Sequence, residues 1–510
     1  MLLPLCLSLL LVATVVRLVW HGRHWRRLGL EGPCGWPLVG NMLNFALARQ
    51  SYGEVYEWIY RTNPGLKYVG FYRLFNEPAL LVRDQDLLRQ ILVGTNFADC
   101  ADNVAYVDHR RDVLASHNPF IASGDRWRIF RADLVALFTP LRVRQMLPHV
   151  DTACRLLRDQ VSVGCFEAKE LATRYTLQVI ASVVFGLDAH CLGGQQKSEQ
   201  PSRWLEWLAP LFQPNGWSLL ETIALLHSPR LGRLIGHRWV NQSPIFFFLI
   251  SKLLFPYRYV PLNLQHWFRE LVAARRTSGN NLLQWLAEGK RSLGQEELAG
   301  HATTLLLEGY ETSAMLLAVT LYELAINQDV QGRLHLELDG VGQGQDRDLL
   351  GQSALGELRY TEAALLEALR LHPAMQALQK RCTKSFTLPP QKSGCNGKLK
   401  VDLGTVLVLP VQAIHLDPEL YPEPRQFRPE RFLNQAPVGC RFLGFGAGAR
   451  MCPGMRLGLL QTKAALATLL QDHCVHLADQ DQARMEVSPL TFLTASKRGI
   501  WLRLERRSHQ

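Results

Sequence analysis

Along most of the chain, apolar residues recur at the three- and four-residue spacing of amphipathic helices. This spacing dominates from about residue 86 to 325, with polar interruptions at 191–202 and 277–281. The run from 296 to 327 reads as one long, largely apolar helix with a polar break inside it. The pattern therefore predicts a body built mainly from helices, one of which is long, central and buried.

Shorter stretches have the character of β-strands. Residues 67–84 predict a hairpin with a turn at Asn76-Glu77-Pro78, and short strands are expected at 399–411 and 500–504. After residue 41 no repeat, low-complexity tract or shift in composition marks a further domain boundary. We therefore expect residues 42–510 to form one mainly α body with a smaller β-rich part.

The amino terminus has a different composition. Residues 1–20 are nearly all apolar, and at about 1.5 Å per residue such a helix is long enough to cross a bilayer. No basic side chain precedes this run, whereas Arg23, Arg26 and Arg27 follow it directly. A cleaved signal peptide would show the opposite order, so the pattern favours an uncleaved signal-anchor with the body in the cytoplasm. Residues 21–41, basic and rich in proline and glycine, are expected to form a hinge.

Composition and charge narrow the classes of function. The chain of 510 residues is 47% hydrophobic and carries a net charge of +11 at pH 7. Its basic residues are scattered, which argues against nucleic-acid binding and favours a membrane surface or an acidic protein partner. The 11 cysteines include no C-x-x-C pair, so we expect reduced thiols and no disulfide framework.

One cysteine stands out because of its surroundings. Cys452 precedes a helical pattern from Met455, and a helix N-terminus favours a thiolate through its dipole and free N–H groups. Arg450 offers a cation to an anionic ligand, and nearby glycines let the backbone approach a flat ligand. A single cysteine is more often an inert buried thiol, so the whole segment carries the prediction. It reads Phe445-Gly446-Ala447-Gly448-Ala449-Arg450-Met451-Cys452-Pro453-Gly454.

This decapeptide resembles the haem-binding signature of the cytochrome P-450 family, F-x-x-G-x-R-x-C-x-G, at every fixed position. The resemblance implies that Cys452 is the axial thiolate ligand of the iron in haem b, and that dioxygen is a co-substrate. It implies further that Phe445, Gly446, Arg450 and Gly454 bind the cofactor. The family's fold would place the haem between the long central helix and the cysteine loop with its following helix.

Further landmarks appear upstream in the order that the family requires. Trp127 and Arg131 share a helix face and match its W-x-x-x-R pattern, whose side chains contact a haem propionate. Lys380 falls where the family has an arginine with the same task, although lysine presents a point charge and no fork. We expect all three residues to bind the cofactor.

The polar break in the long helix contains an acid beside a hydroxyl, Glu311-Thr312, which can relay protons. A helix turn that shows both residues to solvent would look the same. The stretch resembles the family's oxygen-groove motif except at its first position, where Glu308 replaces alanine or glycine. We therefore expect Thr312 and Glu311 to be catalytic. Glu308 is expected either to favour basic or hydroxylated substrates or to point away from the pocket.

Glu367 and Arg370 lie three residues apart on one helix face, where an ordinary surface pair would look alike. In the family, such a pair interacts with the arginine of a later segment, here Arg431, and braces the thiolate side of the haem. The tetrad that begins at His415 also matches the family.

The resemblance runs from the hinge to the last strands and is strongest to microsomal members of animals, with features of the insect xenobiotic-oxidising branch. It implies a haem-thiolate catalytic domain at 42–510 that inserts one atom of dioxygen into an apolar small molecule. Because no nicotinamide or flavin fingerprint occurs, electrons would come from a separate NADPH-cytochrome reductase, or from a cytochrome b-type donor. It implies the endoplasmic reticulum (microsome) membrane, the cytoplasmic side, and a role in hormone metabolism or in breakdown of xenobiotics such as insecticides.

Alternatives stay open at this point. A haem-thiolate isomerase or dehydratase would rearrange peroxides without external electrons, although Glu311 and Thr312 argue against it. A catalytically silent membrane haem binder would keep Cys452 and consume no reductant. A membrane scaffold without haem would require the whole order of motifs to be coincidence.

Overall fold

The computed structural model describes residues 23–192, 203–212, 259–275, 281–342, 351–391, 399–433 and 439–507, except 480, 482 and 490. The signal-anchor predicted at 1–20 and the first two residues of the hinge lie outside these ranges. Across the ranges just given, we find no helix that is both long and apolar enough to cross a membrane.

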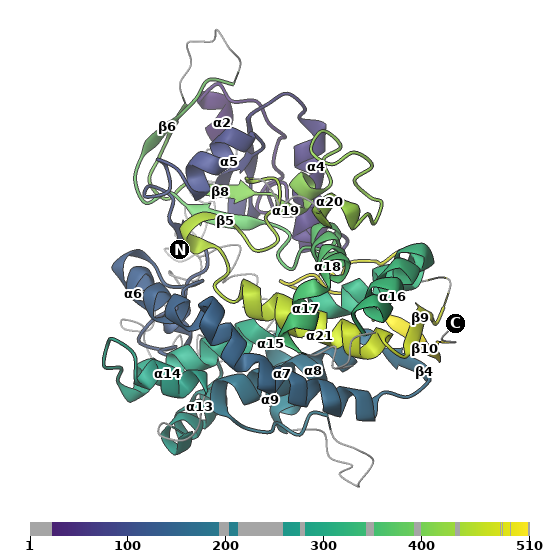
Figure 1. Cartoon of the computed structure of the whole chain (residues 1–510). Coiled ribbons are helices and arrows are strands. Elements are labelled where there is room, and N and C mark those ends of the chain that lie inside the picture. The colour runs from purple at the N-terminus through teal and green to yellow at the C-terminus, as the bar shows by residue number, and fades with distance from the viewer. Residues whose placement is uncertain are drawn as a thin grey trace, which may run out of the picture.

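Helices make up most of the described chain, which confirms the mainly α prediction (Figure 1). They are α2 (His24–Arg27), α3 (Leu43–Ala46), α4 (Tyr52–Thr62), α5 (Gln85–Leu92), α6 (Gly124–Val135), α7 (Pro140–Gln160), α8 (Ala168–Phe185), α9 (Arg203–Phe212), α13 (Leu262–Arg275), α14 (Leu282–Ala287), α15 (Gln295–Ile326), α16 (Gln328–Gly342), α17 (Gln352–Glu357), α18 (Arg359–Leu371), α19 (Val411–His415), α20 (Glu430–Leu433) and α21 (Met455–Leu470). Short 3-10 turns are η1 (Leu74–Asn76), η2 (Ala115–His117), η3 (Ala136–Phe138) and η4 (Gly448–Arg450).

The strands of the described chain form three small sheets. They are β1 (Tyr68–Tyr72), β2 (Pro78–Val82), β3 (Asp102–Asn103), β4 (Gly164–Glu167), β5 (Leu378–Arg381), β6 (Phe386–Leu388), β7 (Leu399–Val401), β8 (Val406–Leu409), β9 (His473–Leu477) and β10 (Trp501–Arg506). The largest sheet has the order β1-β2-β8-β5-β3, a second is β4-β10-β9, and β6 pairs with β7. The predicted hairpin is β1 and β2, paired antiparallel from Tyr68↔Val82 to Tyr72↔Pro78.

The long helix α15 lies at the centre of the helical part and packs against α8, α13, α18 and α21 (Figure 1). The sequence predicts one long helix at 296–327 with polar residues inside an apolar stretch, and α15 runs through these residues without interruption. Within it, the hydroxyl of Thr312 donates to the carbonyl of Glu308 one turn earlier, at 2.8 Å. The polar residues therefore sit on a continuous helix whose orientation is set by its neighbours.

The described part of the hinge packs against the β-rich part. Trp25 is buried, and its indole Nε1 donates to the carbonyl of Phe71 on β1 at 2.9 Å. A Cβ on Gly32 would lie 1.9 Å from the carbonyl oxygen of Gly70, so only glycine allows this close approach. The segment that follows the predicted anchor is thus held in a set orientation relative to β1.

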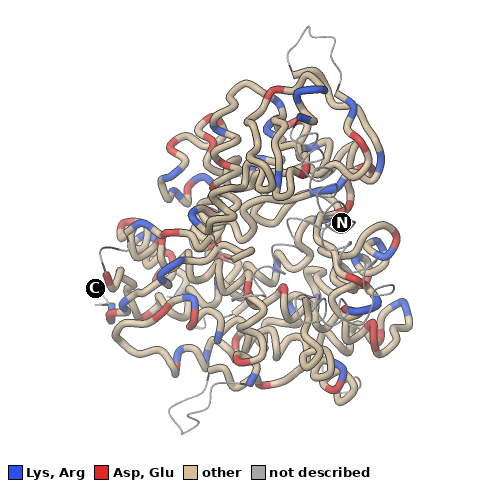
Figure 2. The backbone as a smooth tube through the Cα atoms, turned by 180° about the vertical axis from the view of Figure 1, so that it is seen from behind, with Lys and Arg blue, Asp and Glu red and all other residues tan. Residues whose placement is uncertain are grey.

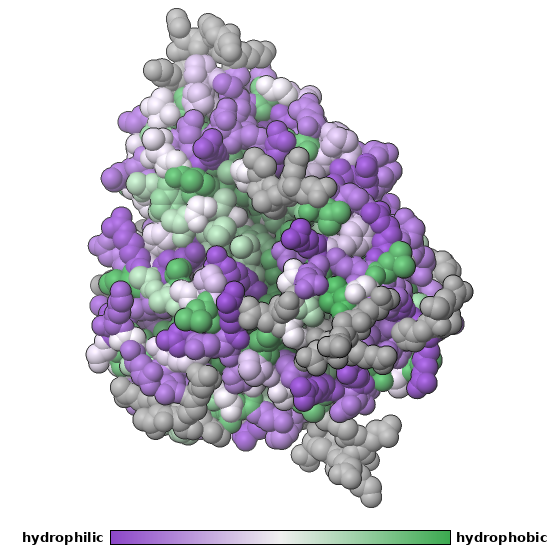
Figure 3. Space-filling view, in the orientation of Figure 1, coloured by the Kyte–Doolittle hydropathy of each residue, from purple (hydrophilic) through white to green (hydrophobic). Residues whose placement is uncertain are grey.

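Among the described residues, two large hydrophobic cores are found besides a small cluster of Ala122, Trp127 and Phe130. The larger core belongs to the helices around α15, and the smaller one lies under the β-rich part with α4 and α5. Apolar surface gathers in a hollow between these two parts (Figure 3). The cavity described next takes its walls from both, because α15 and β5 each contribute lining residues.

Candidate active site

The loop that enters α21 has a backbone that depends on glycine. Gly446 and Gly448 have φ of +71° and +70°, which side chains rarely adopt. A Cβ on Gly448 would also lie 2.0 Å from the carbonyl oxygen of Leu92, at the end of α5. The loop closes on itself where the N–H of Cys452 donates to the carbonyl of Phe445 at 2.8 Å. Glycine at these positions therefore allows the conformation of the loop, and at 448 it allows the loop to pack against the end of α5.

The Cys452 thiol opens into a cavity inside the protein. Burial raises its pKa to about 11, while the backbone N–H groups of Gly454 and Met455 and the charge of Arg131 favour the thiolate. The helix start thus supplies the donors that the sequence predicts, but burial outweighs them in the protein alone. A metal cation at the sulfur would reverse the balance, since a coordinating thiol loses its proton.

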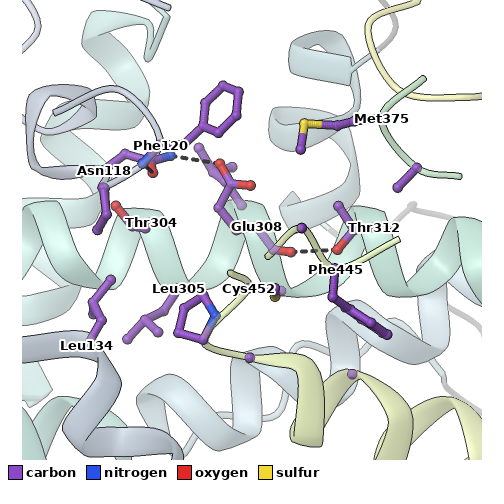
Figure 4. Close-up of a pocket in the computed structure, with 18 of the residues that line it drawn as sticks. Asn118, Phe120, Leu134, Thr304, Leu305, Glu308, Thr312, Met375, Phe445 and Cys452 are labelled. Carbon is purple, nitrogen blue, oxygen red and sulfur yellow. Dashed lines mark hydrogen bonds between the residues drawn. The ribbon is translucent and has the colours of Figure 1, made fainter. Parts of the chain in front are cut away.

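The cavity has a volume of about 330 Å³ and mostly apolar walls. Nine of the ten predicted site residues line it, and they come from α6, α15, β5 and the cysteine loop. These residues are Trp127, Arg131, Thr312, Lys380, Phe445, Gly446, Arg450, Cys452 and Gly454. Figure 4 shows Glu308 and Thr312 on α15 with Phe445 and Cys452 nearby. The fold thus brings together motifs that lie more than 300 residues apart in the sequence.

Three cations share one wall of the cavity. Arg450 donates to the carbonyls of Pro119 and Ala122, and its guanidinium lies 4.3 Å from the centroid of the Trp127 ring. Arg131 donates to the carbonyl of Met451, and Lys380 donates to Oδ1 of Asn103 at 2.8 Å..

This wall carries more positive charge than its own carboxylates neutralise. In the described part of the chain, Asp102 is the only carboxylate within 4 Å of any of these cations, and it contacts Arg450 at 3.1 Å. Burial lowers the pKa of Lys380 to about 7 and that of Arg450 to about 10. Nε of Arg450 is buried and has no hydrogen-bond partner in the described chain. Buried cations need an anion beside them, so the wall fits the two propionates of a haem.

Glu311 does not line the cavity. Its carboxylate forms an ion pair with Lys169 on α8 at 2.8 Å, and Lys169 also donates to the hydroxyl of Thr173 at 2.9 Å. Successive residues on a helix point in directions about 100° apart, so Glu311 and Thr312 face different surroundings. The acid and the hydroxyl are neighbours along the chain without facing the same space.

Glu308, the departure from the family motif, does face the cavity. Nδ2 of Asn118 donates to its Oε1 at 2.7 Å (Figure 4). Burial raises the pKa of this carboxyl, and the hydrogen bond from Asn118 lowers it in part. Of the two orientations that the sequence leaves open for Glu308, the structure shows the one towards the pocket.

Behind the cysteine loop, Glu367 and Arg370 form a two-pronged ion pair with distances of 2.7 and 2.8 Å, and both side chains are fully buried. Nε of Arg431 joins the same carboxylate at 3.2 Å. Arg370 also donates to the carbonyl of His415 at 2.7 Å. The surface reading of this pair is wrong, because its groups are buried and tie α18 to the later segment.

Some residues at the site had no signal in the sequence. Asn118 and Lys169 belong to no motif, and they lie 190 and 142 residues from the carboxylates that they contact. Asp102, the partner of Arg450, lies 348 residues from it along the chain. Only the unexpected acid at 308, in an apolar helix, hinted that a polar partner must exist.

A family model described as Cytochrome P450 matches residues 30–503. The chain belongs to the cytochrome P450 family. It is 74% identical over 509 residues to the probable cytochrome P450 308a1 of Drosophila melanogaster, and the match covers 100% of each chain. It is 31% identical to the probable cytochrome P450 6a13 of the same fly, with 98% of each chain covered. The probable cytochrome P450 28c1 of that fly is 32% identical, over 97% of this chain and 96% of the relative.

This chain is therefore a P450 monooxygenase that uses haem b, a cysteine thiolate as ligand of the iron, and dioxygen as co-substrate. Cys452 is the only cysteine among the described residues that line the cavity, which makes it the candidate for this ligand. As a family member the chain also takes electrons from a redox partner and acts on a small molecule. The expected kinship with insect members is confirmed by the fly relatives.

Proposed function

We propose that this P450 oxidises apolar small molecules at the cytoplasmic face of the endoplasmic reticulum, with electrons from NADPH-cytochrome reductase or from a cytochrome b-type donor. The observation that carries the proposal is the cavity itself, which combines apolar walls with Cys452 and Thr312. Bound at Cys452, haem supplies the oxidative chemistry. The protein supplies the pocket, the protons and the charges.

Thr312 is proposed as the group that positions a proton beside the co-substrate dioxygen. Its hydroxyl hydrogen is directed to the carbonyl of Glu308, so its oxygen is left to accept a hydrogen bond from a donor in the cavity. Glu311 would bring protons from outside, since the Glu311 and Lys169 side chains are 13% and 22% exposed. For this the ion pair with Lys169 must open, because it now holds the carboxylate away from the cavity.

Cofactor binding is proposed to divide among the remaining residues. Arg131, Arg450 and Lys380, with the ring of Trp127 behind Arg450, would hold the propionates. Phe445, Gly446 and Gly454 line the cavity beside the thiol and would pack on the macrocycle.

A membrane location is supported by the first 75 residues of the chain. The apolar run at 1–20 precedes the basic residues of the hinge, as in a signal-anchor. Large apolar side chains are exposed just after it, and they can enter the membrane interface. These are Leu28, Trp36, Leu38, Leu47 and Phe75. Removal of residues 2–20 is expected to weaken attachment to membranes and to leave the haem spectrum intact.

The electron donor is proposed from charge. The chain has a net charge of +11, and basic residues are spread among acidic ones over the back of the molecule (Figure 2). Such a surface suits a transient contact with an acidic flavoprotein or haem protein better than a nucleic acid. We further propose a role in the metabolism of hormones or the breakdown of xenobiotics such as insecticides, which fits an apolar cavity of this size.

The test is reconstitution of the haem-loaded protein with NADPH-cytochrome reductase in phospholipid vesicles. The expected product of an apolar probe carries one oxygen atom from isotopically labelled dioxygen, and its formation requires NADPH. Product formed from a peroxide without NADPH would favour the isomerase or dehydratase. No consumption of reductant with any probe would favour the silent haem binder.

A further inference from the structure

Glu308 is the only acidic side chain among the described residues that line the cavity. The other charged lining residues are Arg131, Lys380 and Arg450, all on the wall that fits the propionates. Much of the remaining wall is apolar. It includes Phe120, Ile121, Ile180, Val184, Phe212 and Phe492. A single carboxylate in such a wall is costly unless it meets a partner that compensates it.

Asn118 holds this carboxylate in place without neutralising it. Its Oδ1 accepts from the N–H of Phe120 at 2.8 Å, and this fixes which end of the amide donates to Glu308. The backbone N–H of Asn118 donates to the carbonyl of Ala115 at 3.0 Å, and its side chain is buried. In the described chain, this amide is the only group that donates to the Glu308 carboxylate, at Oε1. The charge therefore stays available to a ligand.

The carboxylate of Glu308 also lies close to Thr312 and Cys452, the groups proposed to act in the reaction. Glu308 precedes Thr312 by four residues on α15, which is about 6 Å along the helix axis. Its side chain points towards Asn118 and Phe120 (Figure 4). It is near enough to the Cys452 thiol that its charge raises the pKa of that thiol. A group bound at Glu308 would thus anchor a molecule within the reaction space.

We propose that Glu308 selects apolar substrates that carry a protonated amine, which it holds while the rest of the molecule packs on the apolar walls. The inference rests on the proposed function, because it names the substrate class of the same site. A charged amine would form a short, charge-assisted hydrogen bond with the fixed carboxylate. A neutral molecule of the same shape would leave the carboxylate desolvated with no cation beside it, so the site discriminates against that molecule.

The test compares two ligands by titration of the Soret band of the haem-loaded protein. One is a tertiary arylalkyl amine too hindered to ligate iron, and the other is its neutral carbon isostere. The unmodified protein is expected to bind the amine about tenfold more tightly or better. Glu308→Gln is expected to bring the two Kd values within about twofold of each other, since an amide carries no charge.

Glu296→Gln is the matched control. It makes the same chemical change on the same helix, at a half-exposed side chain that is paired with Arg269 and does not line the cavity. This variant is expected to keep the preference for the amine. Equal loss of preference in both variants would overturn the proposal, because it would trace the effect to net charge alone.

Two further results would contradict it. The first is equal binding of amine and isostere by the unmodified protein, a comparison that needs no variant to fold. The second concerns the Glu308→Gln variant in acidified organic solvent. If its haem retention changed while its preference for the amine did not, the carboxylate would contact the cofactor and not the substrate. The carbon monoxide spectrum is recorded first for each protein. Absence of the thiolate-type band in the unmodified protein would contradict the proposed function. A normal spectrum without a preference for the amine would contradict this inference alone.

Discussion

The backbone N–H of Leu443 donates a hydrogen bond to Nε2 of His415 at 2.8 Å. Because an N–H cannot accept, Nε2 is the acceptor, and the ring proton is on Nδ1, which donates to the carbonyl of Arg370 at 3.0 Å. A neutral imidazole thus links the end of α18 to the chain two residues before Phe445. Burial lowers the pKa of His415 to about 3, which keeps it neutral.

Acid should therefore weaken the fold through His415. An unfolded histidine has a pKa of about 6.5. Between this value and the folded pKa the unfolded state binds more protons, so the free energy of unfolding decreases as the pH is lowered. His415→Gln keeps a donor and an acceptor but does not titrate. We expect the unmodified protein to lose up to about 1.4 kcal/mol per pH unit more than the variant below pH ~6.5. Urea unfolding at neutral pH and at pH ~5 measures the difference, and parallel pH curves would contradict it.

Arg131 is expected to retain the cofactor. Its side chain lines the cavity, whereas Arg128 on the same helix has a side chain that is 73% exposed and pairs with Asp125. Arg131→Leu should weaken haem retention about tenfold or more, as expected for loss of a charge-assisted hydrogen bond. Arg128→Leu should change it little. Haem transfer to apomyoglobin reports the retention, and similar transfer rates for both variants would count against the assignment.

Gly448 is expected to be irreplaceable for steric reasons. Gly448→Ala combines a positive φ with a contact of 2.0 Å to the Leu92 carbonyl oxygen and should cost about 2–5 kcal/mol. Gly439 has a φ of +65° with no atom within 4 Å of a Cβ, so Gly439→Ala isolates the backbone strain, about 1–2 kcal/mol. Thermal unfolding of the two variants separates the contributions. Equal losses would mean that the contact with α5 is relieved without cost.

Thr312 is expected to matter for product formation more than for binding. Thr312→Val removes the hydroxyl in the cavity and should lower product formation by about 10- to 100-fold, with the Kd of the probe changed by less than about threefold. Thr303→Val is the control, because Thr303 is buried on the same helix, donates to the Ala299 carbonyl and does not line the cavity. Product yield per NADPH consumed is the measurement. Equal effects of both variants would point to helix damage.

The motifs were readable from the sequence because their residue types and spacing are local. The decapeptide around Cys452, the long helix and the hairpin at 67–84 all appear in the structure where the pattern predicts them. The direction in which a side chain of α15 points was harder to predict. Whether Glu311 or Glu308 faces the cavity depends on how α15 is rotated against α8 and α18, and the packing of distant segments sets that rotation.

Partners that lie far apart along the chain could not be predicted. Asn118 contacts Glu308 only because the loop after η2 folds over α15, and nothing near Asn118 signals this. The short strands β3 and β4 fall within a region of helical spacing, where a few residues pair with strands formed much later. Burial is likewise a property of the whole fold, which is why spacing alone could not distinguish the Glu367–Arg370 pair from a surface pair.

The central claim is that Cys452 is the thiolate ligand of the haem iron. The carbon monoxide difference spectrum of the reduced protein tests it most directly. We predict a red-shifted Soret band of the thiolate type in the unmodified protein, and its loss in Cys452→Ser with the fold intact by circular dichroism. A histidine-type band in the unmodified protein, or a thiolate-type band that persists in Cys452→Ser, would contradict the account.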